Sequence, residues 1–180
     1  SSDFDETSSQ GTILAWVRPD AIASWDSIFN KADGTGNLYW HLVLRDTGQV
    51  MVAMQPSGAI ARFAQSSKTI STAKGDWHLV GCTMGADNHY RIYIDDLGDS
   101  AYIYNSGGGD EYNGSNGQWW NDITAADRIS IGSLQRNSGT GHFNGAIAQV
   151  GVWGGSSSTT GVLTADQIAA IYKLGPSADW

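Results

Sequence analysis

The sequence predicts an all-β fold: an antiparallel β-sandwich of the jelly-roll type with one short C-terminal helix. Glycine is frequent (23 of 180 residues), proline is scarce (3), and Ser, Thr and Asn separate short apolar runs. Eight tryptophans supply large flat side chains that suit the space between two sheets. Short β-prone runs between turn residues, with no helical pattern among them, are typical of a sandwich.

The strands are predicted where apolar and polar residues alternate or where β-branched and aromatic residues are enriched. These segments are residues 12–18, 27–31, 38–45, 50–55, 60–65, 77–84, 90–95, 100–104, 128–131 and 146–153. Turn dipeptides such as Asp33-Gly34, Thr47-Gly48 and Lys74-Gly75 lie between them. The near-regular spacing predicts antiparallel hairpins that close into two packed sheets.

The single predicted helix follows residue 164. Thr164 can cap its first turn, and Gln167, three residues later, can return the hydrogen bond as in a capping box. Ile168 and Tyr172 then share one face, and Gly175-Pro176 ends the helix. A helix this short is marginal alone, so we expect it to dock on the sandwich.

Composition excludes several classes of protein. We expect one domain over residues 1–180, with its core at about 11–173. The net charge is −8 and no basic cluster occurs, which argues against nucleic-acid binding. The longest apolar runs, such as 13–17, are too short to span a bilayer, so no membrane insertion is expected. Cys82 is the only cysteine and is predicted to be a small buried side chain, with no internal disulfide and no nucleophilic role.

Five stretches carry a resemblance to a known family. They are GTILAWVRP (11–19), DWHLV (76–80), YRIYIDD (90–96), RISIG (128–132) and FNGAIAQV (143–150). In this order they resemble the laminin-G-like branch of the concanavalin-A-like lectin/glucanase superfamily. The segment Leu163-Thr164-Ala165 and the closing helix follow as in that family. The resemblance covers residues 11–173 and implies the fold more strongly than the function.

The chain departs from the family pattern in three places. Many relatives have Asp-Gly where this chain has Asp95-Asp96, so a tight turn is not expected there. Gln149 stands where many relatives have an acidic residue, which in some members helps to hold a structural calcium. A neutral amide binds calcium weakly, so the resemblance implies no metal and no cofactor here, with a weak calcium site as the alternative. The segment before Gly11 is short for the family, so we expect an edge strand to be missing or to be supplied by a neighbour.

Catalysis is not expected. Glycoside hydrolases need two carboxylates about 5 to 10 Å apart, and relatives of this fold typically carry them in an E-x-D-x-x-E motif. Glu6 and Glu111 are the only glutamates, and that motif is absent. Asp95 and Asp99 are the nearest substitute pair, but we interpret them as turn residues. No G-x-S-x-G serine motif and no zinc-type histidine spacing occur.

The candidate binding site is the long segment 106–122, which is too long for a routine hairpin loop. Flat aromatic faces beside a few polar groups match what a sugar site uses. The predicted ligand-binding residues are Trp119, Trp120, Tyr112, Asp110, Asn113 and Asn116. Three interpretations of the tryptophan pair remain open: a glycan site, a plug that folds back under the loop, or an interface with an identical neighbour. Trp16, Trp40, Trp77 and Trp153 are predicted to fill the core.

Two functional hypotheses follow. The first is a secreted carbohydrate-binding, lectin-like adhesion module. The second is a structural surface protein of a phage virion, such as a capsid decoration or tail-fibre domain, because the F-N-G-x-I-A-x-V-G-V-W ending resembles domains of phage structural proteins. The lone thiol, the acidic surface, the short N-terminus and the absence of a visible signal peptide favour the virion. We therefore expect a non-catalytic, surface-displayed module, on a virion surface or extracellular, whose partners are a glycan, other virion or surface proteins, or copies of itself.

Overall fold

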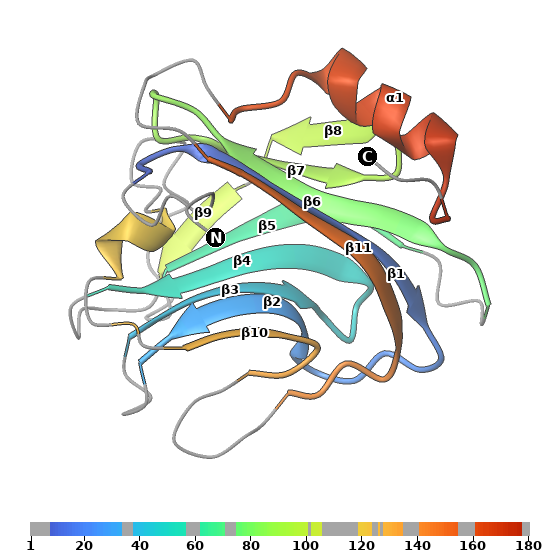
Figure 1. Ribbon diagram of the computed structural model, residues 1–180. Helices are drawn as coiled ribbons and strands as arrows, with labels where there is room; N and C mark the ends of the chain where they lie inside the picture. The colour runs from blue at the N-terminus through green and yellow to red at the C-terminus, as the bar shows by residue number, and fades with distance from the viewer. Residues whose placement is uncertain are drawn as a thin grey trace.

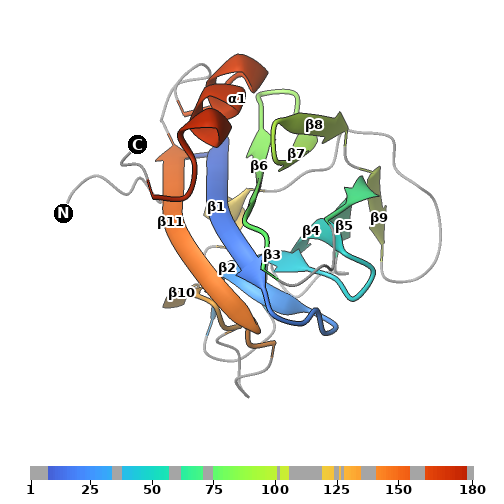
Figure 2. The same ribbon diagram turned by 90° about the vertical axis from the view of Figure 1, so that its right-hand side faces the viewer.

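The computed structural model describes residues 8–33, 38–56, 62–70, 75–100, 102–105, 119–123, 126, 128–134, 141–154 and 161–177. Its strands form two antiparallel sheets that pack face to face, as Figures 1 and 2 show, which confirms the predicted sandwich. The described helices include none with the length and apolarity needed to cross a bilayer.

The strand order places neighbouring hairpins side by side. The five-stranded sheet runs β11 (Gly145–Gly154), β1 (Gly11–Pro19), β6 (His78–Met84), β7 (Tyr90–Ile94) and β8 (Leu97–Ser100). The six-stranded sheet runs β10 (Arg128–Ile131), β2 (Asp26–Ala32), β3 (Tyr39–Leu44), β4 (Gln49–Gln55), β5 (Arg62–Thr69) and β9 (Tyr102–Asn105). Each predicted strand overlaps an observed one, except that the single predicted segment 100–104 is two strands in different sheets.

A tight turn does form at Asp95-Asp96, contrary to expectation. Ile94 pairs with Leu97 across it, so only two residues connect β7 to β8. Asp95 has φ 59° and takes the left-handed conformation, which Asp adopts more readily than most residues. Its carboxylate accepts a hydrogen bond from the Leu79 N–H at 3.1 Å and lies 3.1 Å from Nδ1 of His78. These contacts fix the turn without glycine.

The main core lies between the two sheets. Trp40 is fully buried there, and its indole N–H donates to the hydroxyl of Tyr90 at 2.7 Å. Cys82 is also fully buried, as predicted, and burial raises the pKa of its thiol far above the ordinary range. Trp77 and Trp153 differ from the prediction: they are only partly buried and pack on the outer face of the five-stranded sheet.

The helix α1 (Ala165–Leu174) lies over that outer face (Figures 1 and 2). Its capping box is present, because Thr164 Oγ1 accepts from the Gln167 N–H at 3.3 Å and Gln167 Oε1 accepts from the Thr164 N–H at 2.9 Å. Ile168 is fully buried, and the Tyr172 ring stacks on Trp16 with 5.7 Å between centroids. The docked helix covers one sheet and leaves the outer face of the other to the loops.

Candidate functional site: a pocket on the six-stranded sheet

The predicted tryptophan pair lies inside the main core. Trp119 is 0% exposed and Trp120 is 1% exposed. The Trp119 ring packs against Trp40 and Tyr90, with centroid distances of 5.4 and 6.1 Å, and Trp120 lies 6.3 Å from Phe29. The side chains are therefore where the plug interpretation puts them, and a buried ring offers no face to a sugar.

The other four predicted ligand-binding residues cannot be placed. Asp110, Tyr112, Asn113 and Asn116 lie outside the described residues. Their role stays a prediction, and it now lacks the exposed tryptophan platform on which it was built.

The outer face of the six-stranded sheet carries a second apolar cluster. Along β3, Trp40 and Leu42 belong to the main core, whereas Tyr39 and Val43 belong to this second cluster. Because successive side chains of a strand point to opposite faces, the second cluster faces away from the core. Its members are Ala32, Tyr39, Val43, Met51, Ala53 and Phe63, with Trp25 packed against them.

A pocket of about 350 Å³ opens over this cluster. Aromatic residues supply much of its lining, and Ser24 and His41 are polar residues beside them. The lining residues are Ser24, Trp25, Tyr39, His41, Phe63, Leu134 and Gly141. The volume lies at the lower end of the range for small-molecule sites, ~300–1,000 Å³. The strand register brings His41 and Phe63 to the same face of the sheet. His41 pairs with Ala53 on β4, and Ala53 pairs with Phe63 on β5, so the three side chains lie side by side.

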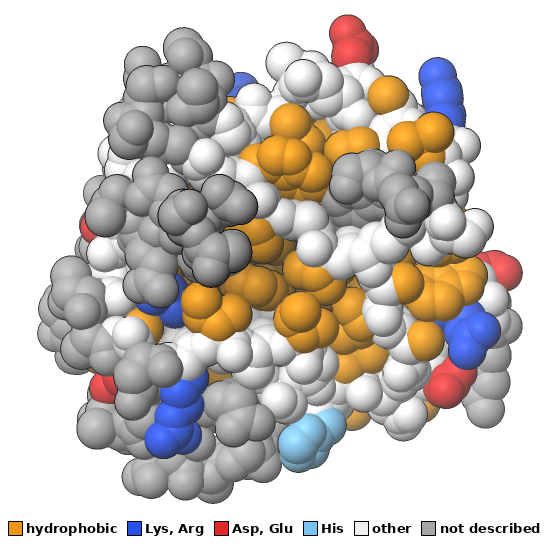
Figure 3. Space-filling model, in the orientation of Figure 1, with side chains coloured by type: hydrophobic (Ala, Val, Ile, Leu, Met, Phe, Trp, Pro, Cys, Tyr) orange, Lys and Arg blue, Asp and Glu red, His pale blue; other side chains and the backbone are white. Residues whose placement is uncertain are grey.

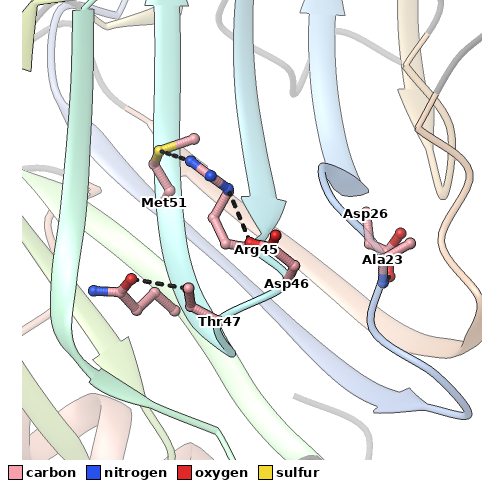
Figure 4. A network of polar contacts seen from close by, with 7 residues as sticks. Ala23, Asp26, Arg45, Asp46, Thr47 and Met51 are labelled. Carbon is pink, nitrogen blue, oxygen red and sulfur yellow. Dashed lines mark hydrogen bonds and ion pairs between the residues drawn. The ribbon is translucent and has the colours of Figure 1, made fainter.

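Trp25 forms one wall from an unusual backbone conformation. Its φ is 70°, which is a clear outlier for a bulky residue and costs about 1–3 kcal/mol. The turn is held by Asp26, which is buried and whose carboxylate accepts from the Ala23 N–H at 2.9 Å (Figure 4). Burial raises the pKa of Asp26, and the hydrogen bond from Ala23 partly offsets that rise.

Gly141 lets a second segment pass close behind this turn. Its carbonyl accepts a hydrogen bond from the Ser27 N–H at 3.0 Å. Gly141 has φ 76°, and a Cβ built on it would lie 2.5 Å from the carbonyl oxygen of Trp25. Glycine is therefore required for both conformation and space, and the two segments form one continuous wall.

The Trp25 ring is held by two neighbours. The Phe63 ring meets it edge-on, with 5.8 Å between centroids and 60° between planes. The guanidinium carbon of Arg45 lies 4.9 Å from the ring centroid, a cation–π distance. Arg45 does not belong to the pocket lining, whereas Trp25 does.

The absence of calcium stays a prediction, and it rests on Gln149. The described part of the chain contains no group of three or more His, Cys, Asp and Glu residues placed to hold a metal. Gln149 has φ 47° and lies where the pairing of β11 with β1 is irregular. A neutral amide on such a bulge provides neither the charge nor the cluster of oxygens that calcium needs.

Sequence reasoning missed the residues of this pocket. Trp25 lies between predicted strands in no motif, and Tyr39 and His41 read as ordinary strand residues. The available signal was the alternation in residues 38–45, where aromatic and polar side chains fall on the face opposite to Leu42 and Leu44.

Comparison with known proteins places the fold in a family. A model of the laminin G type, described as the concanavalin A-like lectin/glucanases superfamily, matches residues 1–169. No curated protein sequence matches the chain.

Several solved structures are similar at low identity. The CBM40 module of the Ruminococcus gnavus IT-sialidase, bound to α2,3 sialyllactose, is 16% identical over 93% of this chain and 84% of that chain, with a TM-score of 0.72. The leech intramolecular trans-sialidase is 15% identical over 97% of this chain and 24% of that chain, with a TM-score of 0.69. The heptameric SAP-like pentraxin of Limulus polyphemus is 16% identical over 92% of this chain and 70% of that chain, with a TM-score of 0.59. At these identities the likeness shows the fold alone.

Proposed function

Because the chain belongs to the concanavalin A-like lectin/glucanase superfamily, we propose that it is a non-catalytic module that binds a glycan in the pocket beside Trp25. The observation that carries the proposal is the φ of 70° at Trp25, since strained backbone of this kind gathers at functional sites. The fold is also that of the Ruminococcus gnavus CBM40 module, whose structure contains α2,3 sialyllactose.

The chemistry of the pocket suits a sugar. Aromatic side chains bury ~150–250 Å² each, so one ring face can hold the CH groups of a pyranose. Ser24, which is exposed, adds a polar residue to the lining that can pair with the ring hydroxyls. Such a combination of flat apolar area and few polar groups favours weak, orientation-specific binding.

The pocket also supports a non-catalytic role. No carboxylate is among the described residues that line it, whereas glycoside hydrolysis requires two. The nearby Asp26 is 1% exposed and accepts the Ala23 N–H, so it acts on the turn. Glu6 and Glu111, the only glutamates of the chain, lie outside the described residues.

A glycan array tests the proposal with two matched variants. The wild type should bind a subset of glycans, with sialyllactose and neutral glycans both on the array. Trp25→Ala should lose that binding because it removes the ring, while Trp77→Ala should keep it. Trp77 is a fair control because it too is partly buried beneath an arginine, but on the other sheet. A wild type that binds no glycan, or a Trp25→Ala variant that binds like wild type, contradicts the proposal.

For the setting of the module we propose a phage virion surface, with an extracellular, secreted module as the alternative. One observation favours assembly with a protein neighbour. Ile129 and Ile131 on β10 are 44% and 54% exposed, and residues 146–153 of β11 are all partly exposed. Figure 3 shows hydrophobic side chains gathered on the face that β11 crosses in Figure 1. Exposed apolar surface of this kind is typical of protein contacts.

Mass photometry of the isolated chain tests this setting. A displayed subunit should self-associate, and Ile131→Asp should reduce that association. A chain that stays monomeric at every concentration argues against assembly with copies of itself. Genes for capsid or tail proteins beside its own gene would support the virion, and their absence would favour the secreted module.

A further inference from the structure

Arg45 is fixed to the hairpin that joins β3 and β4. Its backbone N–H donates to the carbonyl of Gln49 at 2.9 Å, and its own carbonyl accepts from the Gly48 N–H at 2.8 Å. The side chain is 24% exposed, so its guanidinium is largely enclosed by protein. The base of this side chain therefore cannot shift without opening the hairpin.

The guanidinium has two further contacts within the same hairpin region, and both are long. Nε lies 3.8 Å from Oδ1 of Asp46, and Nη1 lies 3.9 Å from the sulfur of Met51 (Figure 4). Ordinary N–H···O bonds measure about 2.7–3.2 Å, so the contact with Asp46 is long, and the thioether sulfur of Met51 is only a weak acceptor. The Trp25 ring, at 4.9 Å from the guanidinium carbon, is within the usual range for a cation over an aromatic face.

Trp25 needs such support because its backbone is strained. At φ 70° the backbone has a conformation that is unfavourable for a bulky residue, so it persists only where surrounding contacts hold the residue in place. The contact with Phe63, at 60° between the ring planes, packs against the ring. Arg45 covers part of the ring from outside the pocket lining.

From these contacts we infer that Arg45 sets the affinity of the pocket by holding the Trp25 ring, without itself touching the glycan. This inference rests on the proposed function and makes Arg45 a positioning residue for it. A ring that is already held in place binds the glycan more tightly, because less side-chain conformational entropy is lost on binding.

The chain supplies a matched control for the test. The guanidinium carbon of Arg18 lies 5.4 Å from the centroid of the Trp77 ring, which is the same kind of contact on the other sheet. Arg45→Gln and Arg18→Gln therefore remove equivalent interactions, one beside the pocket and one away from it. Arg45→Lys keeps a cation at the ring. Thermal melting checks that each variant is folded.

Titration of the strongest glycans from the array gives the first readout. Arg45→Gln should weaken every bound glycan, neutral and acidic alike, by about three- to tenfold. Arg45→Lys should recover most of the loss, and Arg18→Gln should bind like wild type. A loss confined to acidic glycans overturns the inference, because it means that Arg45 contacts the glycan charge. Unchanged affinity in Arg45→Gln overturns it as well.

A second readout does not depend on any glycan. The indole N–H signal of Trp25, assigned through a Trp25→Phe variant, reports the motion of the ring in NMR relaxation. Arg45→Gln should increase that motion while Arg18→Gln leaves it unchanged. If no glycan binds the wild type, the proposed function fails, and this measurement still decides the role of Arg45. Equal ring motion in wild type and Arg45→Gln overturns the inference.

Discussion

The carboxylate of Asp26 is 1% exposed and accepts the Ala23 N–H at 2.9 Å, so it supports the pocket wall from behind. Burial raises its pKa above 3.8, which means that the charged form is disfavoured in the folded state. The resulting loss of stability begins as the pH rises through 3.8 and is complete above the folded pKa. At neutral pH, the ionisation of Asp26 therefore lowers the free energy of unfolding.

Two substitutions separate the charge from the hydrogen bond. Asp26→Asn keeps an oxygen for the Ala23 N–H but removes the charge, so it should be at least as stable as wild type at neutral pH. Its advantage should shrink as the pH falls toward 3.8, where wild-type Asp26 becomes neutral. Asp26→Ala leaves the Ala23 N–H without its acceptor and should lose about 1–2 kcal/mol. Urea unfolding at both pH values checks this, and a pH-independent difference between Asn and wild type would contradict it.

Individual residues also show where sequence reasoning stops. Trp119 follows a long polar segment, and composition cannot reveal that such a segment ends by inserting its tryptophan into the core. Trp25 has no neighbouring motif, and its importance depends on a positive φ and on contacts with Phe63 and Arg45. Both features arise from tertiary structure, so a local pattern does not contain them.

At the scale of elements, the helix α1 was predictable to its cap. The pattern Thr164 to Gln167 gave the capping box, and the i, i+4 spacing of Ile168 and Tyr172 gave the docked face. The strands were also predictable from local sequence, because apolar and polar residues alternate within each segment. The division of 97–105 into β8 and β9 was not, because Gly98 and Asp99 disfavour a strand and local propensity does not indicate to which sheet a strand belongs.

The cap of α1 gives a prediction for this element. Thr164→Ala removes the hydroxyl that accepts the Gln167 N–H and should lower the free energy of unfolding by about 0.5–2 kcal/mol. Thr164→Ser retains a hydroxyl at the same place and should lose much less. Urea unfolding followed by circular dichroism measures both variants. Equal stability of the Ala and Ser variants would show that the cap does not contribute.

At the scale of the whole molecule, calcium binding can be tested through its effect on thermal stability. The described residues hold no metal-binding cluster, and Gln149 carries no charge. A ligand that binds only the folded state raises its melting temperature. We expect melting curves recorded with calcium and with a chelator to coincide. A melting temperature that climbs with calcium concentration would reveal a site despite the substitution by Gln149.

The architecture as a whole followed from composition and spacing, because a sandwich only requires that short strands alternate and that turns separate them. The binding pocket did not follow, because it combines β3 and β5 with the segments around residues 24, 134 and 141. Those segments are distant in sequence, and only the strand register brings them together.

The step from β8 to β9 has a consequence for unfolding. Ser100 ends a strand of one sheet and Tyr102 begins a strand of the other. The chain also changes sheet between β1 and β2, between β5 and β6 and between β10 and β11. Because the two sheets are connected at each of these places, neither can separate from the other as an independent unit, and we expect them to unfold in one cooperative transition.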